Sequence, residues 1–197
     1  MADFRSETNI GARIRLARRE RGFRTTEDLA DAIPGGNLTA SILENIESGR
    51  KADLSVSQLL NIARALNVPV SMLLAPIGTP NAELDLPNLS DDFADMTAVE
   101  FDSWLSATSA STYRPRLASE RSDIEILASL RELGTLRREL DRLQIVLDTQ
   151  NASGDRDLIA SNPEVQQRLD RISREATRIG ELLASAGLTG IANDPAD

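Results

Sequence analysis

Residues 39–50 read TASILENIESGR, and this stretch predicts a short helix with two unlike faces. Thr39 is suited to be its N-cap, and Gly49 is suited to end it. Ile42, Leu43 and Ile46 recur at the spacing of one helix face, which predicts that they are buried. The opposite face is polar and is not needed for packing within the domain, so it is a candidate surface for contact with a partner.

Four more short helices are predicted around this one, at residues 10–21, 26–33, 56–66 and 70–74. Two of them start with a capping box, formed by Thr25 with Asp28 and by Ser55 with Gln58. Five short helices predict a small all-α domain at residues 1–75. Two adjacent helices joined by a turn, the second with a free polar face, are the arrangement of a helix-turn-helix, which places its second helix in the major groove of DNA.

The middle of the chain has weaker patterns. Four residues that break helices, Pro76, Gly78, Pro80 and Pro87, indicate a linker. A short amphipathic helix is predicted at residues 97–107, and a Ser/Thr-rich second linker follows it. We therefore assign residues 76–119 as a linker region that contains one short helix.

Residues 120–187 predict a long antiparallel helical hairpin or coiled coil, followed by a tail at residues 188–197. In the first long helix, which Ser122 is expected to cap, leucine or isoleucine recurs every seven residues, at Ile126, Leu133, Leu140 and Leu147. In the second, Asn162 is expected to be the N-cap, and Pro163 occupies the first helical position. The apolar residues of the second helix then follow alternating steps of four and three: Val165, Leu169, Ile172, Ala176, Ile179, Leu183 and Ala186.

A break at residues 151–155 is suited to reverse the chain between the two long helices. An isolated two-helix hairpin has little core, so we expect residues 120–187 to associate into a homodimer, in which two hairpins form a four-helix bundle. The alternative is a hairpin that packs only on itself.

The composition excludes several classes of function. The chain has no Cys and no His, so disulfides, thiol nucleophiles, Cys/His zinc sites and histidine acid–base chemistry are absent. There is no glycine-rich phosphate loop, and the carboxylates lack metal-ligand spacing. We therefore expect no enzyme, no cofactor and no metal. No apolar run is long enough to span a membrane and the N-terminus lacks a signal-peptide core, so a cytoplasmic protein with no membrane contact is expected.

The charge is unevenly distributed. Residues 1–75 carry ten Lys and Arg and nine Asp and Glu, whereas residues 76–197 carry twelve and twenty-two, so the net charge of −9 comes from the second part. All but one of the basic residues are Arg, which contacts phosphate in a planar, bidentate manner. Most of the arginines near residues 13–21 are expected to form a solvated helix face.

Several short motifs resemble, in order and spacing, those of the xenobiotic-response-element (lambda-repressor-like) family of helix-turn-helix regulators. They cover residues 9–75 and read IGARIR (10–15), RRERGF (18–23), DLA (28–30), IESGR (46–50) and LLNIARALNV (59–68). The resemblance implies a five-helix DNA-binding domain whose partner is double-stranded DNA.

The resemblance also implies roles for matched positions. Thr26 falls where the family contacts a phosphate at the start of the second helix, and Glu47 falls at a position that is usually structural. The outward face of the third helix would read bases, with Asn45 suited to adenine and Glu44 to cytosine. Arg50 and Lys51 are suited to phosphate. The expected DNA contacts are Thr26, Thr39, Ala40, Ser41, Glu44, Asn45, Arg50 and Lys51.

Two features depart from the family pattern. Residues 34–36, with the sequence PGG, make the turn about three residues longer, and Arg24 adds one more residue. The third helix has no Arg or Lys, although family members often carry one at the position of Ala40 or Asn45. The departures leave the fold intact, but they make the base contacts less defined and predict modest nonspecific affinity.

The leading hypothesis is a sequence-specific transcription regulator, a repressor rather than an activator, that binds DNA as a dimer. A second hypothesis is an antitoxin- or prophage-type regulator whose acidic C-terminal half captures a protein, with residues 76–119 becoming ordered on that partner. A third is a structural adaptor that keeps the helix-turn-helix fold and binds no DNA.

Overall fold

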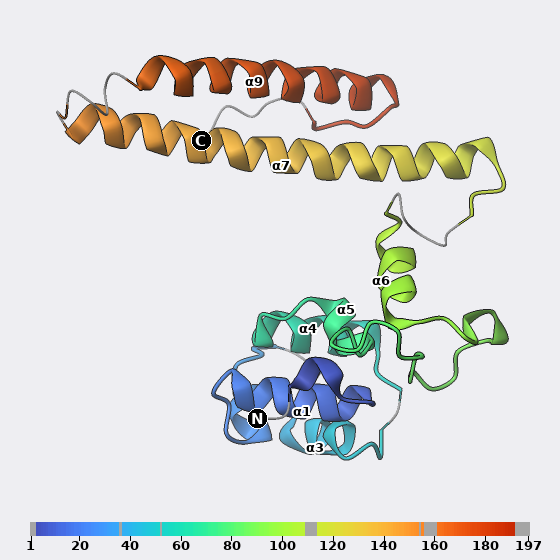
Figure 1. The fold of residues 1–197 in the computed structure, drawn as a ribbon. Helices are drawn as coiled ribbons and strands as arrows, with labels where there is room; N and C mark the ends of the chain where they lie inside the picture. The colour runs from blue at the N-terminus through green and yellow to red at the C-terminus, as the bar shows by residue number, and fades with distance from the viewer. Residues whose placement is uncertain are drawn as a thin grey trace. The chain divides into compact units, whose positions relative to one another are not determined.

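The computed structural model describes residues 3–35, 37–51, 53–108, 114–153, 155 and 161–191. Regular structure in these residues is helical, apart from an isolated antiparallel bridge between Glu83 and Thr97. The all-α prediction is therefore confirmed. Contacts divide the chain into unit 1, Met1–Tyr113, and unit 2, Arg114–Asp197, and each unit is described by itself (Figure 1).

Unit 1 consists of short helices, which in chain order are η1 (Phe4–Ser6), α1 (Ile10–Glu20), α2 (Thr26–Asp31), α3 (Ala40–Glu47), α4 (Val56–Leu66), α5 (Val70–Leu74), η2 (Asp91–Phe93) and α6 (Ala98–Ser106). Both predicted capping boxes are present, at the starts of α2 and α4. Thr39 caps α3, because its side chain accepts a hydrogen bond from the Ile42 amide. Gly22 and Gly49, with φ of 89° and 76°, follow the ends of α1 and α3 in the left-handed conformation that glycine adopts without strain.

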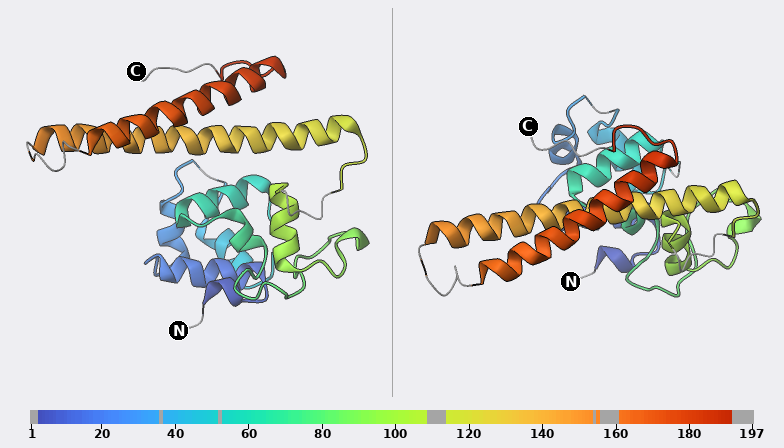
Figure 2. Two further views of the ribbon diagram at one scale, coloured as in Figure 1. Left: turned by 45° about the horizontal axis from the view of Figure 1, so that its top comes forward. Right: turned by 90° about the horizontal axis from the view of Figure 1, so that it is seen from above.

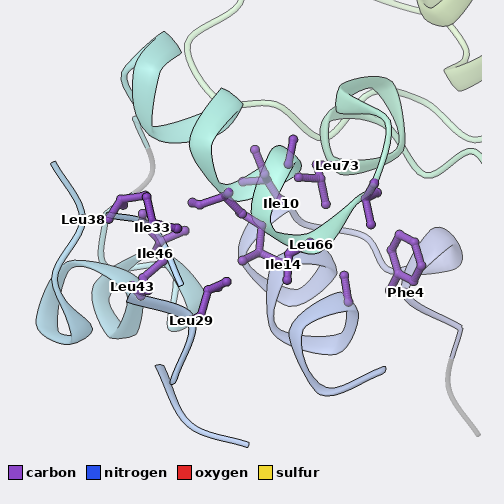
Figure 3. Packing of buried hydrophobic residues seen from close by; sticks show 14 residues of the cluster. Phe4, Ile10, Ile14, Leu29, Ile33, Leu38, Leu43, Ile46, Leu66 and Leu73 are labelled. Carbon is purple, nitrogen blue, oxygen red and sulfur yellow. The ribbon is translucent and has the colours of Figure 1, made fainter. Parts of the chain in front are cut away.

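The core of unit 1 is aliphatic. Ile14, Leu29, Leu43 and Ile62 are fully buried, and they come from α1, α2, α3 and α4 (Figure 3 shows the cluster). Phe4, from η1, packs at the edge of the same cluster and is the aromatic member among its buried residues. The helices are short, so their stability depends on this shared core rather than on helix propensity.

Gly11 marks the closest approach of α1 to α3. A Cβ at this position would collide with the carbonyl oxygen of Ile46. We expect Gly11→Ala to lower the free energy of unfolding of unit 1 by about 1–3 kcal/mol, because the clash outweighs the roughly 1 kcal/mol that alanine adds to helix propensity. The chain's single tryptophan, Trp104, packs in unit 1, so its fluorescence during urea unfolding measures this stability.

Gly134, in the interior of a helix of unit 2, is the matched control for this substitution. A Cβ at Gly134 would meet only the Arg138 guanidinium, at 3.6 Å, which is ordinary contact. Gly134→Ala is therefore expected to stabilise its helix, with a higher midpoint of thermal unfolding by circular dichroism. A Gly11→Ala protein as stable as the parent chain would show that α1 and α3 do not pack this closely.

Residues after α5 continue to pack on unit 1. The Gly78 amide donates to the Arg5 carbonyl at 2.8 Å, and Asp85 forms an ion pair with Arg13. A second cluster surrounds Ala98 and Phe101, and the Trp104 ring contacts Phe93 edge-on, with 5.2 Å between the ring centroids. The sequence placed the domain boundary at residue 75, whereas the contacts place it at Tyr113, because these apolar and ionic contacts attach most of the predicted linker to the helices before it.

Unit 2 contains α7 (Ala118–Ser153) and α9 (Asn162–Ser185), which lie side by side (Figures 1 and 2). Leu133 packs with Ile179 and Leu183 in one apolar cluster, and Leu147 packs with Leu169 in another. The contact that comes earlier in α7 thus comes later in α9, which means that the two helices run antiparallel. Among the described residues, no helix has the length and apolar character required to cross a membrane.

Details at the ends of unit 2 differ from the prediction. Ser122 is not an N-cap, because α7 already begins at Ala118, where the Glu120 carboxylate accepts from the amides of residues 116 and 117. Asn162 is the first residue of α9 rather than its cap. Part of the predicted tail is packed: Ile191 is buried in the cluster with Leu133, and the Arg137 guanidinium donates to its carbonyl at 2.7 Å. Residues 192–197 lie outside the described part of the chain.

Candidate nucleic-acid interface

Helix α3 separates its side chains into a buried and an exposed set. Leu43, Ile46 and Glu47 are buried, whereas Ser41 and Glu44 are exposed. At 100° per residue, Ser41 and Asn45 project from the side opposite Leu43, and Glu44 projects from the flank between that side and the buried face. Asn45 is half-buried, and so is Ala40, which lies between the two faces. The helix therefore collects the polar positions predicted to read bases into one outward surface.

The buried face of α3 is held against α1 by an ion pair. Arg18 of α1 donates from Nε to Glu47 Oε1 at 2.6 Å and from Nη2 to Oε2 at 2.8 Å. Both side chains are more than nine-tenths buried, and the guanidinium also donates to the carbonyls of Phe23 and Arg24. The bound carboxylate raises the pKa of Arg18 above its usual value. A bidentate pair fixes orientation as well as distance, so it sets which face of α3 points outward.

The two remaining polar positions at helix starts have different roles. The Thr39 side chain is exposed, but its oxygen is already used to cap α3. Thr26 is the first residue of α2 and is half-buried. The preceding Thr25 forms the capping box with Asp28, and the Thr25 backbone amide holds the pKa of the Asp28 carboxyl below its usual value.

Arg50 and Lys51 follow α3 directly. Gly49 turns the chain, and the Lys51 amide then donates to the Asn45 carbonyl at 2.9 Å. Arg50 is exposed, and its Nε donates to the Ser48 hydroxyl at 3.1 Å. These contacts keep two cationic side chains next to the C-terminal end of the outward face, although neither forms an ion pair within the described residues.

The arginines of α1 and its C-cap separate into two groups. Arg15, Arg19 and Arg21 are exposed, in agreement with a solvated helix face. Arg13 and Arg18 are buried and bind carboxylates and carbonyls inside unit 1. The sequence pattern did not distinguish the two groups, because it shows spacing along one helix and not the carboxylates that other elements bring near.

Two further polar residues, one before α3 and one in the first turn of α4, form a bond that the sequence did not indicate. The side-chain amide of Asn37 donates to the Ser57 hydroxyl at 3.0 Å, and the side-chain amide of Gln58 donates to the backbone carbonyl of Asn37 at 3.3 Å. These bonds tie the segment before α3 to the first turn of α4. Asn37 and Ser57 are both exposed, so their bond lies at the surface of unit 1.

Comparison of the chain with models of known protein families, with curated protein sequences and with solved structures gives no match. Among the residues that the structure describes, no group of three or more acidic side chains is arranged to hold a metal ion. The feature that bears on function is therefore the geometry of α3 and of the residues that follow it.

Proposed function

We propose that the chain is a sequence-specific DNA-binding transcription regulator, a repressor, that inserts α3 into the major groove as part of a helix-turn-helix with α2. The observation that carries the proposal is the orientation of α3. A buried Arg18–Glu47 pair fixes its inner face, and its outer face presents Ser41, Glu44 and Asn45 without using them for packing.

The residue types on this surface suit the edges of base pairs. An asparagine amide can bond adenine in a bidentate manner, a glutamate can accept from the amino group of cytosine, and serine can bond either. Arg50 and Lys51 would contact phosphates and fix the register of the helix on the duplex. Thr26, at the start of α2, would contact a phosphate on the other side of α3.

The charge of this surface predicts weak binding by a single copy. The outward face of α3 carries Glu44 and no cation, Glu47 being buried against Arg18, and residues 1–75 have a net charge near zero. We therefore propose that residues 120–187 hold two copies together as a homodimer. Its two helix-turn-helix domains, which we call heads, each bind weakly and together bind a two-part operator. Linking the heads raises affinity through effective concentration.

Light scattering on the full chain at micromolar concentration should give twice the monomer mass of 21.4 kDa. A monomer would contradict the dimer.

A second candidate is favoured by the composition of the later part of unit 1. Residues 65–113 contain seven Asp and Glu and no Lys or Arg, which suits a basic protein partner, as in antitoxin- or prophage-type regulators. In the structure, however, residues 76–108 pack within unit 1, so partner capture would use a folded surface rather than coupled folding. A stable complex with a basic protein, formed equally well with and without DNA, would favour this candidate.

The proposal is tested by selecting bound sequences from random duplex DNA, with the full chain and with residues 1–108. An enriched motif is expected from the full chain, with two half-sites about one helical turn apart or more. Residues 1–108 alone should enrich one half-site weakly. No enriched motif from either protein would overturn DNA recognition, whereas a single asymmetric site from the full chain would overturn only the two-part operator.

Substitutions on α3 and after it should have different effects. Ser41→Ala and Asn45→Ala should change the preferred sequence, with about 1–3 kcal/mol lost at the base that each reads. Arg50→Ala should weaken binding to all sequences alike and reduce the salt slope by about one. Arg64→Ala, an exposed arginine on α4, is the matched control and should change neither. Fluorescence anisotropy with the selected and scrambled duplexes measures both quantities, and unchanged specificity in both α3 variants would mean that another face reads DNA.

A further inference from the structure

The segment that follows α5 is attached to α1 by a fully buried arginine. Arg13 has no exposed surface, and all five of its N–H donors are used. Three bind the carbonyls of Leu73, Leu74 and Glu7 at 2.7–3.0 Å. The other two bind both oxygens of Asp85, at 2.8 and 3.0 Å. This bidentate pair fixes residues 83–92, which we name the acidic strap, to the helical core of unit 1.

The acidic strap then reaches the residues that follow α3. Leu86 packs against the apolar cluster of unit 1, and the Asn88 amide donates to Asp53 Oδ1 at 2.9 Å. Asn88 has a φ of 61°, so the strap turns sharply at this contact. Asp53 lies two positions beyond Lys51. The strap is therefore bonded to the loop that carries the two cations proposed to bind phosphate.

The strap brings negative charge to this loop. Asp91 and Asp92 are exposed, and neither forms an ion pair within the described residues. Asp91 is three residues beyond Asn88 and Lys51 is two residues before Asp53, so at about 3.6 Å per residue the backbone contributes at most about 18 Å to the separation of Asp91 from Lys51, to which the side chains and the hydrogen bond between Asn88 and Asp53 add. The Debye length is about 30 Å at 0.01 M salt and about 10 Å at 0.1 M. The field of the strap therefore acts on Lys51 at low ionic strength, where the Debye length exceeds the backbone separation, and is largely screened at 0.1 M.

We propose that the acidic strap positions the loop after α3 through Asn88 and lowers the attraction of Arg50 and Lys51 for phosphate. This inference rests on the proposed DNA binding for its biological role, but the field itself exists without DNA. The strap makes a single head a weak binder, so only a paired head stays on DNA. The strap belongs to unit 1, because Arg13 and Leu86 hold it there.

The first arm of the test measures DNA binding. The full chain and its Asp91→Asn/Asp92→Asn variant are titrated against the selected duplex from 0.01 to 1 M salt. The variant should bind about two- to fivefold tighter at low salt, with the difference vanishing near 1 M. Asp123→Asn/Asp141→Asn changes the net charge equally on exposed residues of α7 and is the matched control. An equal gain from the control would show a general charge effect and overturn a role for the strap.

The second arm needs no DNA, because Lys51 is the chain's only lysine and so reports the local potential. Its acetylation by an anionic sulfosuccinimidyl ester is compared with that by a neutral succinimidyl ester, with peptide mass spectrometry resolving Lys51. The ratio of anionic to neutral labelling should rise about twofold or more in Asp91→Asn/Asp92→Asn at 0.01 M salt and stay constant at 1 M. Asn88→Gly, which keeps the left-handed backbone but removes the amide, should also raise it.

The two arms of the test distinguish a failure of the proposed role of the strap from a failure of the proposed DNA binding. A labelling ratio that none of these substitutions changes overturns the strap, whether or not the chain binds DNA. A ratio that rises as expected in a chain that binds no duplex supports the field of the strap and overturns the proposed function. Tighter DNA binding together with a raised ratio supports both.

Discussion

Replacing Glu47 by alanine is expected to lower the free energy of unfolding of unit 1 by about 3–5 kcal/mol. The substitution leaves the Arg18 guanidinium buried without its carboxylate, although the carbonyls of Phe23 and Arg24 still accept from it. An unpaired buried charge costs far more than an exposed pair contributes, because the group keeps its desolvation penalty and loses the attraction that offset it. The same change should allow α3 to rotate, because the bond that fixes its inner face is lost.

Urea unfolding followed by the fluorescence of Trp104 measures the loss in unit 1 separately from unit 2, which has no tryptophan. Glu44→Ala, on the exposed face of the same helix, is the matched control and should change stability by less than about 0.5 kcal/mol. The double substitution Arg18→Met/Glu47→Leu should recover most of the loss, since a buried pair can often be replaced by apolar side chains at little cost. A Glu47→Ala chain as stable as the control would show that water reaches Arg18.

The sequence was sufficient where structure depends on neighbours a few residues apart. The capping boxes at Thr25 and Ser55 and the cap at Thr39 all occur as predicted, because each requires only residues within one helical turn. Periodicity also separated the buried Leu43 and Ile46 from the exposed Ser41 of α3. Local chemistry therefore predicted the starts of α2, α3 and α4 and the buried face of α3.

The sequence was insufficient where two distant charges meet. Arg13 and Arg18 look like the exposed Arg15 and Arg19 beside them, and only the fold shows that their carboxylates lie 72 and 29 residues further along. For the same reason residues 76–86, rich in proline and glycine, resembled a free linker. Turn residues indicate that a chain is not helical, but they do not indicate whether it packs against something. The acidic strap is an example, because it is not helical at residues 83–90 and yet packs on unit 1.

The proposed site shows the same division. The polar face of α3 follows from its sequence, whereas the bond between Asn37, before α3, and Ser57, on α4, depends on the fold. The charge near Arg50 and Lys51 also depends on residues 83–92, which no local pattern connects to α3. An estimate of the proposed DNA affinity from residues 1–75 alone therefore omits residues that are bonded to the loop after α3.

Replacing Asp85 by alanine is expected to destabilise unit 1 by about 3–5 kcal/mol, an effect as large as that of Glu47→Ala. Arg13 is the more deeply buried of the two arginines, and without Asp85 two of its five donors lose their acceptor. Asp85→Asn should cost less, because the amide oxygen still accepts one hydrogen bond. Asp91→Ala, on the exposed part of the same strap, is the control and should be nearly neutral.

The same reasoning predicts that a chain ending at residue 75 is less stable than one ending at residue 108, by at least the cost of Asp85→Ala. The shorter chain removes both the carboxylate that pairs with Arg13 and the apolar residues that cover Ala75. Circular dichroism during urea unfolding compares the two chains, because only the longer one contains Trp104. Adding Arg13→Met to the shorter chain should restore part of its stability, since a buried apolar side chain needs no carboxylate. Equal stability of the two truncated chains would mean that residues 76–108 are a linker after all, and that Arg13 is satisfied by carbonyls alone.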